Sequence, residues 1–395
     1  MSTRLGFCFQ TFICALIKPY YWTAYRIRSY GRLPRARGAM LVLCNHQHDL
    51  DTTMTIIKMQ LDGPWDKPIY SAGSRRMFEP GFLAMRLPWL RSYLRKVDAT
   101  KLFDALGILP IENEIRTRSL ASLAWWIYVR HGEVPLPEAF DQSVLARLDP
   151  QAQSTSVGQL FGRRWFKQWQ QMRVRLKSLL EPYRSQVFAQ TREHLEPDYR
   201  RLEQTLIAGN TLFLTPEGRY TPDGHMKRLR TAFQRFCPLA QSIWLLAVSY
   251  DVFVGERLSC LFRVLAPPDP GDLEASMRGP RPVTVSQLLS SWLREQDRSS
   301  FSRAGAASAV SQRLAALPRD AFVDPELLRD PEKLSNAALD GLVRLGTVVE
   351  RTGALQMTQQ RRHPQFPLGE DMVAFQAAFL AESIEALERL AGRRS

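Results

Sequence analysis

The sequence is poor in cysteine, in acidic residues and in long apolar runs. Its five cysteines are scattered and odd in number, with neither a metal-binding spacing nor a disulfide framework, which favours a reducing compartment. Asp and Glu number 39 against 53 Lys and Arg, so the formal net charge is +14. This excess of positive charge favours an anionic partner: a nucleic acid, an acidic membrane surface or a phosphorylated substrate.

The amino-terminal segment is first apolar and then basic. Residues 5–17 are apolar and aromatic, but they are short of the roughly 20 residues that span a bilayer, and no small-residue cleavage site follows them. Tyr, Trp and Arg are frequent after Lys18, and no acidic residue precedes Asp49. Such a mixture suits the headgroup region of a membrane. We therefore expect residues 1–30 to form an amphipathic helix that lies in the membrane plane at the cytoplasmic face. A helix that covers the protein's own core is the first alternative, and a true membrane span is the last.

From residue 39 to about residue 270, short apolar runs alternate with helical patterns. This alternation predicts an α/β fold with a mainly parallel sheet flanked by helices. We expect strands at residues 40–44, 68–72, 107–111, 211–215, 243–250 and 258–264, and helices at 115–129 and 229–241. The residues beyond 282 show helical periodicity, and we expect no site chemistry there.

Two polar residues follow the apolar run 40–44 and carry the first chemical signal. The run stops at Asn45 and His46, and Asp51 follows five residues after the histidine. On one helix only residues three or four apart are neighbours, so this pair can meet if His46 lies in a loop and Asp51 in the first helical turn. A carboxylate bonded to one imidazole nitrogen orients the ring as a general base. Cys44 is expected to be the last buried residue of the strand, so His46 would activate a substrate hydroxyl directly.

A second turn, Pro216-Glu217-Gly218-Arg219, follows the apolar run 211–215. Proline and glycine favour a tight turn, and glycine lets the backbone approach a ligand closely. Glu217 can accept a hydrogen bond from a substrate hydroxyl, and Arg219 can hold a phosphate with its planar fork of donors. We predict that this turn binds the substrate.

The pattern Asn45-His46-x-x-x-x-Asp51 resembles the first motif of the glycerolipid acyltransferases, the lysophosphatidic acid acyltransferase group. The apolar strand and turn at residues 212–219 resemble the third motif of that family. Both motifs occur in the family's order, and each stands at the end of an apolar run. The resemblance covers roughly residues 35–265.

The sequence departs from the family at two places. The family's third motif usually reads Phe-Pro-Glu-Gly-Thr-Arg, whereas here Arg219 precedes Tyr220. In the second motif, a glycine and an apolar run lead to an arginine that contacts the phosphate of the acceptor. Residues 107–112 match this pattern, but Asn113 stands at the place of the arginine. Asparagine is neutral, so a hydroxyl lipid that is neutral or differently decorated becomes an alternative acceptor.

We expect the chain to divide into three parts: residues 1–38 as the membrane-interacting helix and a basic linker, 39–270 as the acyltransferase domain, and 271–395 as a C-terminal helical extension. Comparison with the family marks residues from about 131 to 205 within the domain as a helical insertion, with a long helical pattern from 160 to 208 that breaks near Pro182. Its basic and aromatic part is interpreted as a solvated face, a lipid contact or a nucleic-acid contact, in that order.

The resemblance implies an O-acyltransferase of phospholipid biosynthesis that needs no metal. It would move a fatty acyl group from acyl-CoA or acyl carrier protein to the hydroxyl of a lysophospholipid or related glycerolipid, at an anionic membrane surface. His46 and Asp51 would be catalytic, and Asn113 and residues 216–219 would bind the substrate. The alternative is a catalytically inactive, membrane-associated lipid-binding protein of the same fold. Nucleic-acid binding rests on charge and on the basic, aromatic stretch alone, and we place it last.

Overall fold

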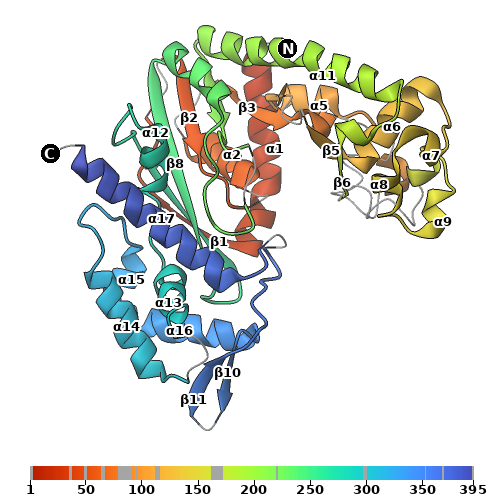
Figure 1. The fold of residues 1–395 in the computed structure, drawn as a ribbon. Helices are drawn as coiled ribbons and strands as arrows, with labels where there is room; N and C mark the ends of the chain where they lie inside the picture. Colours follow the sequence, from red (N-terminus) through yellow and green to blue (C-terminus); the bar gives the residue numbers. More distant parts are fainter. Residues whose placement is uncertain are drawn as a thin grey trace. The chain divides into compact units, whose positions relative to one another are not determined.

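The computed structural model describes residues 3–34, 38–48, 51–63, 67–78, 91–94, 97–111, 116–161, 172–218, 221–296, 300–351, 353–366 and 369–393 (Figure 1). The chain folds into two compact units. One consists of Tyr70–Thr205, and the other of Ser2–Ile69 together with Leu206–Ser395.

A seven-stranded, mainly parallel sheet flanked by helices confirms the predicted fold class. Its strand order is β1-β9-β8-β2-β7-β3-β4. The strands are β1 (Tyr25–Tyr30), β2 (Met40–Cys44), β3 (Ile69–Ser74), β4 (Ile108–Ile111), β7 (Thr211–Leu214), β8 (Ser242–Asp251) and β9 (Leu258–Leu265). β2 pairs in parallel with both β7 and β8, whereas β9 runs antiparallel to β8. All five residues of β2 are buried, as expected for a strand with neighbours on both sides and helices on its faces.

The amino-terminal helix α1 (Thr3–Ala24) is shorter than the predicted one. Residues 25–30, expected to be helical, form the edge strand β1, which pairs in parallel with β9. The physical reason is that Tyr and Ile favour strands, and pairing of residues 25–30 with β9 overrides the helical pattern that precedes them. Helix α1 packs on α2 (Asp51–Asp62), and the Gln60 amide donates to Thr11 at 2.8 Å. Among the described residues, every helix falls short of the length or the apolarity that crossing a bilayer requires.

The unit Tyr70–Thr205 has an apolar core of its own around α6 (Leu120–His131). α6 begins later than predicted because Thr117–Ser119 form strand β5, which pairs with β6 (Arg173–Arg175). Among the described residues, the predicted helix over 160–208 is wrong before α11 (Tyr183–Ile207), because 3-10 turns lie at Gln159–Phe161 and Leu176–Ser178 and strand β6 at Arg173–Arg175. The basic and aromatic residues 162–171 lie outside the described residues. The remaining short helices are α4 (Arg91–Leu94), α5 (Thr100–Ala105), α7 (Leu136–Ala139), α8 (Gln142–Leu145) and α9 (Pro150–Gln153).

The C-terminal residues are largely helical, as predicted, and they share one apolar core with the sheet. Val42 of β2, Leu288 and Phe375 belong to the same buried cluster. The helices are α12 (Leu273–Arg278), α13 (Val285–Leu293), α14 (Arg303–Ala315), α15 (Pro325–Arg329), α16 (Pro331–Arg344) and α17 (Met372–Gly392), with a hairpin of β10 (Val348–Arg351) and β11 (Ala354–Met357) before α17. The helix predicted at 229–241 is instead two 3-10 turns, since Pro238 cannot donate a backbone bond.

Candidate active site

The loop after β2 is anchored to the next strand by an asparagine. The Asn45 amide donates to the Val248 carbonyl at 3.0 Å, and its side-chain oxygen accepts the Val248 N–H at 2.7 Å. This pair of bonds is the one a neighbouring strand would make, so Asn45 extends the β2–β8 ladder past the end of β2. The chain then turns through residues 46–48, and the N–H of Asp51 bonds the His48 carbonyl at 3.0 Å as α2 begins.

His46 and Asp51 meet as the spacing predicted. The imidazole Nδ1 lies 3.1 Å from Asp51 Oδ2, with His46 in the loop and Asp51 in the first turn of α2. Because an ionised carboxylate only accepts, Nδ1 carries the proton, and Nε2 is the ring nitrogen that can take one. The Asp51 side chain is 0% exposed. A buried carboxylate beside one imidazole nitrogen holds the ring in the tautomer that a general base requires.

Asp51 also shapes the loop that carries His46. Its Oδ2 accepts the backbone N–H groups of Gln47 at 2.5 Å and His48 at 2.7 Å, and its Oδ1 accepts the hydroxyl of the buried Tyr250 on β8. Sequence reasoning missed Tyr250, because it is one more apolar-run residue in a predicted strand. The loop therefore closes around one carboxylate, and the orientation of the imidazole depends on it.

The second predicted turn lies beside the first, because β7 is the parallel neighbour of β2. Glu217 Oε1 accepts the N–H of His46 at 2.7 Å, and Oε2 accepts the N–H of Lys227 at 3.2 Å. Gly218 has φ +73°, and a Cβ there would lie 2.4 Å from the Arg230 side chain, so only glycine suits this position. Pro216 accepts the Arg230 N–H through its carbonyl. In this structure, Glu217 thus fastens two backbone segments to each other.

Two predicted substrate-binding residues, Asn113 and Arg219, lie outside the described residues. Cys44 is fully buried at the end of β2, as predicted, and burial raises the pKa of its thiol well above the ordinary value. It is therefore not a thiolate nucleophile. The described residues contain no group of three or more His, Cys, Asp or Glu side chains placed to hold a metal ion.

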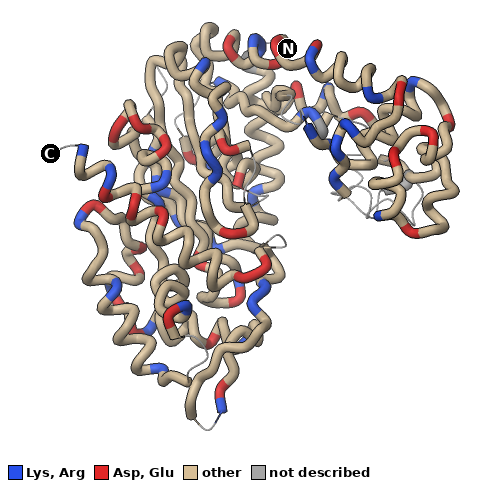
Figure 2. The backbone as a smooth tube through the Cα atoms, in the orientation of Figure 1, with Lys and Arg blue, Asp and Glu red and all other residues tan. Residues whose placement is uncertain are grey.

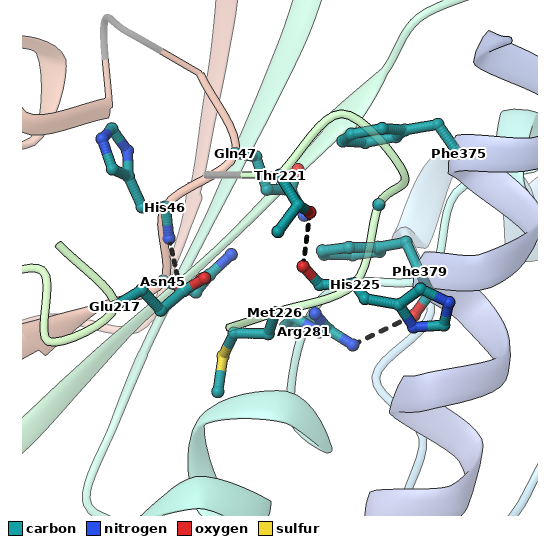
Figure 3. Close-up of a pocket in the computed structure, with 11 residues that line it drawn as sticks. Asn45, His46, Gln47, Glu217, Thr221, His225, Met226, Arg281, Phe375 and Phe379 are labelled. Atoms are coloured by element: carbon teal, nitrogen blue, oxygen red, sulfur yellow. Dashed lines mark hydrogen bonds between the residues drawn. The ribbon is translucent and has the colours of Figure 1, made fainter. Parts of the chain in front are cut away.

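A small cavity lies next to the loop that follows β2, and residues of the C-terminal region form part of its wall (Figure 3). It is lined by residues of both motif loops, of the loop 221–226 and of the C-terminal region: Asn45, His46, Gln47, Glu217, Thr221, Gly224, His225, Met226, Arg281, Phe375 and Phe379. Its volume is about 10 Å³, room for a single water. Two buried donors in its wall, Gln47 Nε2 and Arg281 Nη1, have no hydrogen-bond partner within the described part of the chain.

Figure 3 shows the imidazole of His46 pointing away from Arg281 and Phe379. The cavity therefore lies on the backbone side of the loop, opposite to the side where the ring points. Residues beyond 282, where no site chemistry is expected, nevertheless contact the loop that carries His46: Phe375 and Phe379 of α17 line this cavity beside Arg281, and the Gln365 carbonyl lies 2.5 Å from His48 Nε2. Nothing in their sequence spacing marks them.

No family model matches the chain, and no curated protein matches it at a significant level. The resemblance to the glycerolipid acyltransferases therefore stands on the two motifs.

The buried carboxyl of Glu217 predicts a pH-dependent stability. Burial raises its pKa from 4.5 to about 7, so the folded state favours the protonated form. Its contribution to stability is therefore fully present below pH 4.5 and is lost as the pH rises towards about 7. Relative to Glu217→Gln, the wild-type free energy of unfolding should fall by up to about 3 kcal/mol over this range. Urea unfolding of both proteins across the range measures it, and a difference that does not change with pH would contradict burial as the cause.

Proposed function

We propose that the protein is an O-acyltransferase that moves a fatty acyl group from a thioester, acyl-CoA or acyl carrier protein, to the hydroxyl of a lysophospholipid or related glycerolipid. The observation that carries the proposal is the 3.1 Å contact of His46 Nδ1 with the buried carboxylate of Asp51, at the end of a central parallel strand. Ends of parallel strands are the usual place for sites in α/β folds. The neighbouring Pro-Glu-Gly turn supports the same reading, because it bonds the His46 backbone directly.

The reaction follows from the orientation of the imidazole. His46 Nε2 takes the proton of the acceptor hydroxyl as the oxygen attacks the thioester carbonyl, and Asp51 stabilises the imidazolium that forms. When the tetrahedral intermediate collapses, the carbon–sulfur bond breaks and the imidazolium returns its proton to the leaving thiolate. The products are an ester and a free thiol, and no acyl-enzyme forms.

The negative charge that develops on the carbonyl oxygen needs donors other than the loop itself. The N–H groups of His46, Gln47 and His48 already bond Glu217 and Asp51. Other donors near the strand ends therefore stabilise the oxyanion in this proposal. Arg219 and Asn113, which follow β7 and β4, would contact the acceptor.

Replacement of His46 tests the catalytic assignment. Purified protein given acyl-CoA and a panel of lysolipids should release free CoA, and His46→Ala should lower turnover by at least roughly 100-fold, because a general base is lost. His131→Ala is the matched control: His131 is an exposed histidine at the end of α6, bonded to Gln186 rather than to any motif residue. Full activity of the folded His46→Ala protein would contradict the assignment and favour the lipid-binding alternative.

We further propose that α1 lies on the anionic cytoplasmic face of a membrane. One side of the helix packs on the protein through Gln10, Cys14 and Tyr21, whereas Phe12, Leu16 and Tyr20 are 64–67% exposed at intervals of four residues. Arg26 and Arg28, expected to meet headgroups, instead form ion pairs with Glu326 and Asp324. The apolar stripe of α1 is therefore the stronger basis for membrane contact.

The charges of the C-terminal region also favour α1, rather than the C-terminal helices, as the membrane-binding surface. Figure 2 shows Asp and Glu interspersed with Lys and Arg along this region. Arg278 pairs with Glu274 on α12, and Arg389 of α17 pairs with Asp272. Paired charges attract anionic lipid only weakly, so the C-terminal helices are poor candidates for the membrane face.

A charge placed in the apolar stripe should weaken membrane binding. The variant Phe12→Glu/Leu16→Glu should sediment with anionic phospholipid vesicles at least about 10-fold less strongly, since a buried Phe or Leu contributes about 1.5–3 kcal/mol. Leu328→Glu serves as control, because Leu328 is an apolar residue on α15 that is also well exposed (58%). Unchanged binding of the double variant would remove α1 as the contact.

A further inference from the structure

The loop 221–230 is held from two sides by the buried side chains of Glu382 and Glu217. The N–H of Met226 donates to both oxygens of Glu382 on α17, at 3.2 and 3.1 Å. The next N–H, of Lys227, donates to Glu217 at 3.2 Å, and the other oxygen of Glu217 accepts the His46 N–H. An unbroken series of bonds thus runs from the C-terminal helix through Met226, Lys227 and Glu217 to the backbone of His46.

Glu382 is itself fixed by a buried arginine. Arg281, which is 1% exposed, pairs with Glu382 at 3.0 Å. Its Nε donates to the Arg278 carbonyl and the Ser383 hydroxyl, and its Nη2 donates to the Phe379 carbonyl. The guanidinium also lies 3.7 Å from the centre of the Phe379 ring. A buried charge is costly unless it is paired and hydrogen-bonded, so neither member of this pair can move without the other.

We propose that Arg281 and Glu382 are positioning residues of the active site, through which α17 sets the place of the His46 backbone. They touch no reacting atom. They place Met226, and with it Lys227 and Glu217, and a displacement of about 1 Å at a catalytic group can cost about 100-fold in rate. The kinetic part of this inference rests on the proposed acyltransferase function.

Two double variants that differ in one group test the inference. Arg281→Met/Glu382→Leu removes both charges together, which spares the cost of a lone buried charge, and also removes the acceptor of the Met226 N–H. Arg281→Met/Glu382→Gln restores a carbonyl acceptor of similar size. We expect kcat of the Leu variant to fall about 10- to 100-fold with KM changed less than about threefold, and the Gln variant to recover most of the loss.

The matched control is another buried ion pair, which joins the C-terminal region to the sheet. Arg28 of β1 pairs with Asp324 at 2.7 Å, with side chains 13% and 1% exposed, and neither bonds the loop 221–230. Arg28→Met/Asp324→Asn should keep wild-type kcat.

Glu382→Asp is a further variant for the case that the double variants do not fold. It keeps the charge of Arg281 paired but shortens the reach to Met226, and it should show the same loss confined to kcat. Wild-type kcat in folded Leu or Asp variants, no recovery with Gln, or an equal loss in the control would overturn the inference.

A spectroscopic reading separates this inference from the proposed function. The proton between His46 Nδ1 and Asp51 should give a low-field NMR resonance in protein labelled at histidine nitrogen, assigned by its loss in His46→Ala. The resonance should shift or broaden in Arg281→Met/Glu382→Leu and stay unchanged in Arg28→Met/Asp324→Asn. If the wild-type protein acylates no lysolipid, the proposed function fails. The NMR measurement still tests whether Arg281 and Glu382 position His46. A resonance unmoved by the Leu variant overturns that role.

Discussion

One buried carboxylate organises the site. Asp51 has no contact with solvent, so its charge must be compensated inside the protein, and its two oxygens accept from the His46 ring, the Gln47 and His48 N–H groups and the Tyr250 hydroxyl. Withdrawal of any one donor leaves part of a buried charge unpaired. The same interaction therefore turns the chain between β2 and α2 and orients the imidazole, so local folding and chemistry have one cause.

The parallel pairing of three strands brings the remaining parts together. β7, β2 and β8 are consecutive in the sheet and end at the same edge, so residues distant in sequence meet there. Glu217 is 171 residues from His46 and bonds its backbone, and Val248 is 203 residues from Asn45 and bonds its side chain. Glu382 of the C-terminal helix α17 then holds the loop 221–230 by accepting the Met226 N–H. The site is thus assembled from the ends of the sheet and from a region with no motif of its own.

Sequence reasoning found those parts whose signal is local. The apolar runs of β2 and β7 stand out because such strands are buried on both faces, and the polar residues at their ends stand out by contrast. Tyr250 and Arg281 could not be found in this way, since their roles come from tertiary contacts: Tyr250 is 199 residues from Asp51. β1 was mistaken for helix because its aromatic residues continue the apolar pattern of α1. The helix expected at 229–241 failed at Pro238.

The account depends on the carboxylate of Asp51 holding His46 as a base, and the variant Asp51→Asn tests it most directly. An asparagine of the same size keeps an oxygen for the loop but presents an amide that cannot stabilise an imidazolium. The account predicts that kcat for acyl transfer to a lysolipid falls on the order of 10³- to 10⁴-fold, while circular dichroism and thermal unfolding show the wild-type fold. A folded Asp51→Asn protein with kcat within a few-fold of wild type would contradict it.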